Sequence, residues 1–153
     1  DTFIHLIGTP HPNPSKARQF RDVDLVSVRA AVTAAAHAWV KHFIYLSVAY
    51  PAPIMHEYIA VRKEGEAMIR ASGMTATFLR PFYVLGPGHW WPWPLVPVFN
   101  LMRRIPATRD GAVRLGPVTL RQMIRSLVFA VENPPREGIR ALNAPEIRRG
   151  GAA

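Results

Sequence analysis

The sequence predicts an α/β fold in which helices cover both faces of a parallel sheet. Three short apolar segments, Thr2–Ile7, His42–Ser47 and Thr75–Leu79, are typical of strands buried on both sides. Helical patterns lie between them, and strands that alternate with helices indicate parallel pairing. The 153 residues are 49% hydrophobic and 19% charged, which suits a single domain, residues 1–153, with a packed core.

The first strand and the first helix are separated by a proline loop. Residues 2–7 are rich in β-branched and aromatic side chains, and Gly8-Thr9-Pro10 stops the strand. Residues 11–15 (HPNPS) cannot enter a helix interior, because proline lacks the N–H donor. A helix is expected over about Ala17–Ala38, where apolar residues recur at three- and four-residue steps: Leu25, Val28, Val32 and Ala35.

The same alternation continues through the middle of the chain. After the strand His42–Ser47, the loop Tyr50–Pro53 leads into a helix over Ile54–Ser72. Gly73 follows that helix, as expected of a residue that adopts a left-handed cap at little cost. The strand Thr75–Leu79 then ends at Arg80-Pro81.

The last part of the chain begins with an irregular stretch. Residues Phe82–Pro106 are aromatic and broken by prolines, which predicts a long loop. A helix is expected over Val118–Val131, with Thr119 at its start. A short strand over Ile139–Leu142 and a frayed tail over Arg148–Ala153 complete the expected order.

Composition excludes several kinds of site. The net charge is +9, but the basic residues are scattered and no nucleic-acid motif is present, so we expect a small phosphate-bearing ligand rather than nucleic acid. There is no cysteine, and the six histidines lack metal-ligand spacing, so no metal site is expected. No G-x-S-x-G elbow suggests a hydrolase. Glu57, Glu64 and Glu66 are interpreted as ordinary surface charges on a helix.

Tyr58 and the basic residues that follow it are the strongest candidate for chemistry. Tyr58 and Arg62 are four residues apart and share a helix face, while Lys63 is turned about 100° away. A cation beside a phenol stabilises the phenolate, so we expect a lowered pKa for Tyr58 and a role as proton donor. Ser47, at the end of the preceding strand, can hydrogen-bond a substrate oxygen. The alternative is a surface helix with solvated cations.

These residues resemble the later half of the short-chain dehydrogenase/reductase superfamily. The motifs are HFIYLS at 42–47, Tyr58 with a basic residue four positions later, SGMTATFLRP at 72–81 and VLGPG at 84–88. They are most similar to the extended and atypical group, which includes NAD-dependent epimerase/dehydratase-like and NmrA-like proteins. The resemblance implies a Rossmann-like sheet, with its later strands and helices in residues 1–81. The substrate-side loop, a helix and the last strand would then occupy residues 82–153.

The resemblance also implies roles for individual residues. It implies NAD or NADP as cofactor, an unknown small-molecule substrate, and proton transfer by Tyr58 with Ser47, Arg62 and Lys63. The expected cofactor contacts are Gly8, Thr9, Ser47, Tyr58, Arg62, Pro81, Phe82, Tyr83 and Val84, and the expected substrate contacts are His89, Trp90 and Trp91.

The sequence also departs from this family. The family's lysine, four residues after the tyrosine, is Arg62 here, and the Gly-rich first βαβ unit is not found. We therefore expect the chain to represent the C-terminal portion of an NAD(P)-binding oxidoreductase or epimerase-like protein. The alternative is a non-catalytic dinucleotide-binding scaffold or sensor.

The apolar stretch Gly86–Met102 has three interpretations. It carries no Lys, Arg, Asp or Glu, but its prolines make a membrane-spanning helix improbable. The stretch either packs on the last helix, forms a wall of a substrate pocket, or anchors the protein at a lipid surface through Trp90, Trp91 and Trp93. Without a secretory signal or cysteines, we expect a cytoplasmic protein, with peripheral membrane contact as the alternative.

Overall fold

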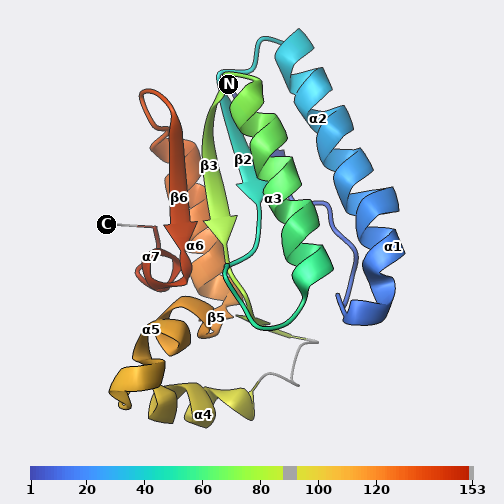
Figure 1. Ribbon diagram of the computed structural model, residues 1–153. Coiled ribbons are helices and arrows are strands. Elements are labelled where there is room, and N and C mark those ends of the chain that lie inside the picture. The colour runs from blue at the N-terminus through green and yellow to red at the C-terminus, as the bar shows by residue number, and fades with distance from the viewer. Residues whose placement is uncertain (88–92, 152–153) are drawn as a thin grey trace.

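The computed structural model, which describes residues 1–87 and 93–151, contains a four-stranded parallel sheet (Figure 1). Its strand order is β1 (Thr2–His5), β2 (His42–Leu46), β3 (Thr75–Arg80) and β6 (Ile139–Asn143). Each neighbouring pair is parallel, so the carboxyl ends of the strands meet at one edge of the sheet. The predicted α/β fold with a parallel sheet is confirmed.

Helices cover both faces of the sheet, as predicted. Phe43, Tyr45 and Phe78 belong to the core cluster that also contains α2 (Val26–His37) and α3 (His56–Ala71). The alternate strand residues Ile44, Leu79 and Leu142 lie in a second cluster with Met123 and Ala130 of α6 (Leu120–Glu132). Figure 1 shows α2 and α3 on one side of the sheet and α6 on the other. This alternation explains why the strands read as continuous apolar runs.

The first helical region differs from the single helix predicted over residues 17–38. A 3₁₀ turn, η1 (Pro14–Lys16), precedes α1 (Ala17–Gln19), and a π-helical segment, η2 (Phe20–Leu25), joins α1 to α2. The π-helical segment carries the fully buried Asp24. Short π segments within helices occur most often where a side chain has a special role.

The stretch after β3 is more ordered than the predicted loop. Val84–Leu85 (β4) pairs in parallel with Val118–Thr119 (β5). Two helices lie between these strands, α4 (Leu95–Met102) and α5 (Pro106–Leu115). Pro97 falls in the first turn of α4 and Pro106 begins α5. Proline is tolerated there because first-turn N–H groups have no partner within the helix.

The C-terminal region confirms one prediction and corrects another. Thr119 caps α6 through a capping box, in which its Oγ1 accepts a hydrogen bond from the Gln122 N–H at 3.2 Å. The predicted fraying of the tail is wrong up to Gly151, because α7 (Ala144–Arg148) is packed against the core. Ile147 is fully buried, and Arg148 donates to the carbonyl of Gly116 at 3.2 Å.

Candidate functional site

The ends of β1, β2 and β3 meet at one place, as the sequence predicts. Beyond the strands, the Ser47 N–H donates to the Leu79 carbonyl at 2.8 Å and the Ala49 N–H to the Pro81 carbonyl at 2.9 Å. The Arg62 guanidinium donates to the carbonyls of Leu46, at 2.9 Å, and Ile7, at 3.3 Å. In open parallel sheets, ligands bind in the crevice outside these carboxyl ends.

Two adjoining cavities lie at this edge. The smaller, of about 310 Å³, is lined on one side by Ser47 and on another by α6. The larger, of about 750 Å³, extends towards His11 and Tyr83. Among the residues described, neither lining contains Lys, Arg, Asp or Glu. The residues shared by both linings are mainly apolar: Pro12, Leu46, Val48, Tyr58, Phe82, Val84 and Leu120.

Tyr58 reaches both cavities from the first turn of α3. Its ring packs edge-on against Phe20, with 5.0 Å between ring centroids, and the Arg62 Cζ lies 5.1 Å from the Tyr58 centroid. The pKa of Tyr58 is raised because burial penalises the phenolate more than the Arg62 charge stabilises it. The expected lowering of this pKa is therefore wrong: the sequence shows the cation but not the loss of water.

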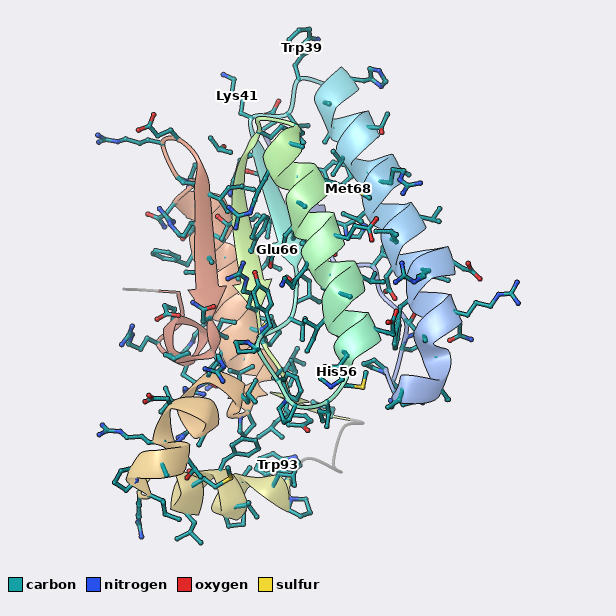
Figure 2. The ribbon with its side chains drawn as sticks, in the orientation of Figure 1. Trp39, Lys41, His56, Glu66, Met68 and Trp93 are labelled. Carbon is teal, nitrogen blue, oxygen red and sulfur yellow. The ribbon has the colours of Figure 1, made fainter. Side chains whose placement is uncertain are left out.

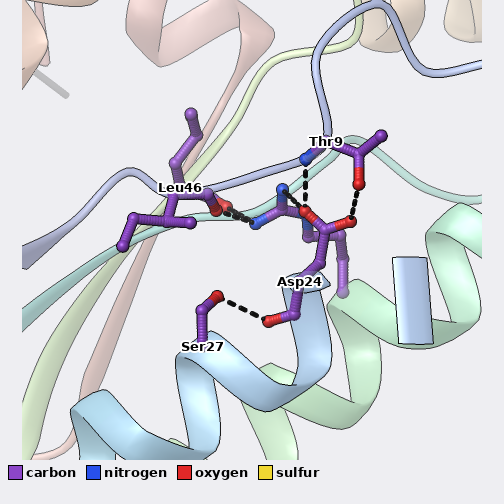
Figure 3. A network of polar contacts seen from close by, with 6 residues as sticks. Thr9, Asp24, Ser27 and Leu46 are labelled. Atoms are coloured by element: carbon purple, nitrogen blue, oxygen red, sulfur yellow. Dashed lines mark hydrogen bonds and ion pairs between the residues drawn. The ribbon is translucent and has the colours of Figure 1, made fainter. Parts of the chain in front are cut away.

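Arg62 lies behind the cavity wall. Its side chain is only 2% exposed, and its Nη2 forms an ion pair with the Asp24 Oδ1 at 3.1 Å. Asp24 also accepts hydrogen bonds from the Thr9 N–H at 2.6 Å and from the Thr9 hydroxyl at 2.9 Å (Figure 3). A Cβ at Gly8 would lie 2.2 Å from the Arg62 Nη2, so glycine leaves room for the guanidinium. In this structure Thr9 and Arg62 thus both bind Asp24, and Gly8 lies beside the Arg62 guanidinium.

Ser47 belongs to a second buried polar cluster. Its hydroxyl donates to the Glu66 Oε1 at 2.7 Å, and the Tyr50 hydroxyl donates to the Glu66 Oε2 at 3.0 Å. The Arg80 Nε donates to the same carboxylate at 2.8 Å. Glu66 is 3% exposed and lies between α3 and the sheet (Figure 2). The interpretation of Glu66 as a surface charge is wrong, because α3 turns this position towards β3.

Lys63 lies on a different side from Tyr58. It is exposed, and its Nζ lies 5.2 Å from the ring centroid of Tyr50. It is not among the residues that line either cavity. The structure therefore brings Ser47 and Tyr58 to one cavity and leaves Lys63 outside it.

The remaining predicted residues follow β3. Phe82 and Val84 line both cavities, Pro81 lines the smaller and Tyr83 the larger. His89, Trp90 and Trp91 lie outside the described residues, so their predicted substrate contacts remain predictions. Trp93 is described and is 55% exposed.

Sequence reasoning missed Asp24, Glu66 and Arg80, although two of them carry a signal. Asp24 lies four residues before Val28, and Glu66 lies four residues after Arg62, so each shares a helix face with buried residues. A carboxylate on the buried face of a helix indicates a paired charge. Nothing in the sequence pairs Glu66 with Arg80, because the strand register decides that contact.

Comparison with known proteins supports the fold. No protein-family model matches the chain. A ceramide reductase of Caulobacter vibrioides is 33% identical over 91 residues, which is 58% of this chain and 27% of that protein. The chain therefore spans about a quarter of this relative's length.

Solved structures share the architecture at lower identity. A short-chain dehydrogenase/reductase superfamily protein of Agrobacterium tumefaciens with bound NAD matches with a TM-score of 0.65 at 15% identity, covering 93% of this chain and 59% of that one. A UDP-N-acetylglucosamine 4-epimerase of Bacillus cereus matches with a TM-score of 0.64 at 14% identity, covering 97% and 62%. This similarity shows a Rossmann-like fold. The chain spans about three-fifths of the length of each of these neighbours.

The first prediction concerns the Asp24–Arg62 ion pair. We expect Asp24→Ala to lower the free energy of unfolding by roughly 3–5 kcal/mol, because it leaves a buried guanidinium without its counter-charge. Urea unfolding followed by circular dichroism measures this. The control is Asp22→Ala, because Asp22 is 62% exposed in its ion pair with Arg18. This substitution should lower the free energy of unfolding by less than about 1 kcal/mol. Equal losses in the two variants would contradict the prediction.

The second prediction concerns the tyrosine ionisations. Burial raises the pKa of each of the chain's four tyrosines, Tyr45, Tyr50, Tyr58 and Tyr83. A raised pKa keeps the neutral phenol to higher pH, so in an ultraviolet titration the tyrosinate band of the folded protein should appear at higher pH than that of the denatured chain. In denaturant, all four should ionise near their ordinary value of about 10. A tyrosinate signal below pH 9 that Tyr58→Phe removes would show that the Arg62 charge outweighs burial.

Proposed function

We propose that the chain is the later part of an NAD(P)-binding oxidoreductase or epimerase-like protein that uses Tyr58 for proton transfer. The observation that carries this proposal is that Tyr58 and Ser47 line one cavity at the carboxyl ends of parallel strands. This is where a Rossmann-like sheet binds its ligands. Neighbours of the same fold solved with NAD support the choice of cofactor.

The residues of this chain suit the nicotinamide end of such a cofactor. Pro81, Phe82, Tyr83 and Val84 provide apolar and aromatic surface of the kind that packs against a nicotinamide ring. The described lining offers no cation for the pyrophosphate, and the sequence has no Gly-rich turn to bind it. We therefore assign the pyrophosphate contacts to residues outside these 153. When bound, the dinucleotide supplies the hydride chemistry.

Tyr58 is suited to donate a proton. The phenol is protonated at neutral pH, so the hydroxyl can protonate a carbonyl oxygen as negative charge develops there, while burial raises its pKa and weakens it as an acid. Arg62, with its Cζ 5.1 Å from the Tyr58 ring centroid, then stabilises the phenolate that forms. Ser47 donates its own hydrogen to Glu66, so its oxygen is left to accept a hydrogen bond from a hydroxyl group of the substrate.

The lining of the cavities favours an apolar substrate. A sugar nucleotide, which the epimerase neighbours bind according to their names, carries a diphosphate that calls for cations or backbone N–H donors. The described lining has no cation and is built mainly of aliphatic and aromatic side chains. The resemblance to a ceramide reductase agrees with this chemistry. We propose a carbonyl compound with a long apolar chain.

A non-catalytic scaffold or sensor is the second candidate. The observation that favours it is the state of Arg62, which stands at the position of the family's lysine. Arg62 is hidden behind the wall, and its Nη1 and Nη2 groups donate to Asp24 and to the strand-end carbonyls of Leu46 and Ile7. Its Nε has no hydrogen-bond partner among the described residues, but the side chain is only 2% exposed, so this N–H is not presented to a ribose or to a substrate.

The third prediction separates these two functions. In the full-length protein, Tyr58→Phe should lower kcat for the reduction of long-chain ketones by at least about 100-fold, because general acid catalysis is lost. Oxidation of NADH or NADPH at 340 nm measures turnover. Tyr45→Phe, which removes a buried hydroxyl that no described residue hydrogen-bonds and that lines neither cavity, is the matched control and should change kcat little. If the natural protein has no turnover and Arg62→Lys creates it, the scaffold function is correct.

The fourth prediction concerns cofactor affinity. Because the pyrophosphate contacts are assigned elsewhere, the 153-residue chain should bind NADH and NADPH weakly, with no saturation at micromolar concentrations. Isothermal titration calorimetry measures this. Tight micromolar binding would show that residues of this chain hold the pyrophosphate.

A further inference from the structure

The outer side of α4 is an apolar surface. Val98 is 49% exposed and Leu101 60%, and their spacing of three residues places them on one face of α4. Ile105, which lies between α4 and α5, is 45% exposed. Trp93, which precedes the helix, is 55% exposed. None of the eight described residues of α4 is buried and none is charged. We call Trp93, Val98, Leu101 and Ile105 the α4 surface.

Positive charge borders this surface. The segment from Trp93 to Leu115 contains four arginines, Arg103, Arg104, Arg109 and Arg114, and one acidic residue, Asp110. Arg114 is turned towards the protein, where its Nε donates to the Pro51 carbonyl at 3.2 Å. Arg104 and Arg109 are exposed. The apolar residues and these two cations therefore belong to the same end of the molecule.

The other side of α4 is connected to the larger cavity. The ring of Phe99 lies 6.1 Å from the ring of Tyr83, centroid to centroid, in an edge-on contact. Tyr83, together with Gly86 and Pro87 just before the segment that leads to α4, lines the cavity of about 750 Å³. An apolar molecule bound at the α4 surface would thus lie close to a mainly apolar cavity that is large enough for a small-molecule ligand.

We propose that the α4 surface docks onto an anionic lipid bilayer. Helices that lie in a membrane interface bury apolar side chains at the headgroup–acyl boundary and place Lys or Arg near the phosphates. Tryptophan side chains are also enriched at the headgroup level of membranes. A second copy of this chain is a poor occupant, because each copy carries a net charge of +9 and would repel the other. No helix in the described residues is long and apolar enough to cross a bilayer, so the contact is peripheral.

The molecule contains its own control surface. On α6, Leu120, Ile124, Val128 and Val131 are 39–53% exposed and form a comparable apolar stripe. α6 covers the face of the sheet opposite α2 and α3 (Figure 1), and Val128 and Val131 lie towards its C-terminal end, whereas Leu120 at its start lines both cavities. If exposed apolar area alone causes lipid binding, polar substitutions on α6 and on α4 must lower vesicle binding equally.

The experiment measures vesicle binding by flotation, without cofactor or substrate, so that its result is independent of the proposed catalytic function. Vesicles are made of phosphatidylcholine alone or mixed with phosphatidylglycerol. We expect binding to the mixed vesicles, and a partition coefficient about tenfold lower for Val98→Asp/Leu101→Asp. Val128→Asp/Val131→Asp, the matched pair on α6, lines neither cavity and should bind like the natural protein. Circular dichroism verifies that each variant is folded.

A second pair of variants tests the charge. Arg104→Ala/Arg109→Ala should also bind about tenfold less, because each cation near an anionic surface contributes separately. Lys41→Ala/Arg136→Ala removes the same charge beside the amino ends of β2 and β6, where Figure 2 shows Lys41 far from Trp93, and should have little effect. The proposal is overturned if mixed vesicles are not bound, if binding ignores phosphatidylglycerol, or if either control pair loses as much binding as its α4 counterpart.

Discussion

The buried contact between Asp24 and Arg62 joins the segments on which the site depends. Asp24 comes from the π-helical segment η2, Arg62 from α3, and their remaining hydrogen bonds reach Thr9 after β1 and the Leu46 carbonyl at the end of β2. Because both side chains are almost completely removed from water, neither charge is tolerable without the other. The pair therefore fixes the position of α3 relative to two strand ends, and with it the position of Tyr58.

This contact also determines the proton chemistry available to Tyr58. The Arg62 guanidinium lies over the tyrosine ring, but its Nη1 and Nη2 groups are directed to Asp24 and to backbone carbonyls. Burial therefore outweighs the Arg62 charge and raises the pKa of Tyr58. In the proposed function, Arg62 would position the tyrosine and stabilise its phenolate from behind the cavity wall.

A second ion pair supports the other side of the site. Glu66 holds Arg80, at the end of β3, and the hydroxyl of Ser47, which follows β2. Two buried charged clusters thus lie behind the wall, whereas the wall that faces the cavities is apolar. Such an arrangement places the hydroxyl groups of Ser47 and Tyr58 in an otherwise mainly apolar lining.

The sequence by itself determined the parallel α/β fold, because strands buried on both faces must be continuous apolar runs and the helices between them must be amphipathic. It also located Ser47, Tyr58 and the residues after β3, since strand ends and helix starts follow from glycine, proline and periodicity. Only the tertiary structure decided the direction of the Tyr58 pKa shift, the burial of Arg62, the pairing of Glu66 with Arg80, and the helices α4 and α5. These depend on water exclusion and on contacts between residues far apart in the chain, and no local pattern encodes how much solvent a neighbouring element removes.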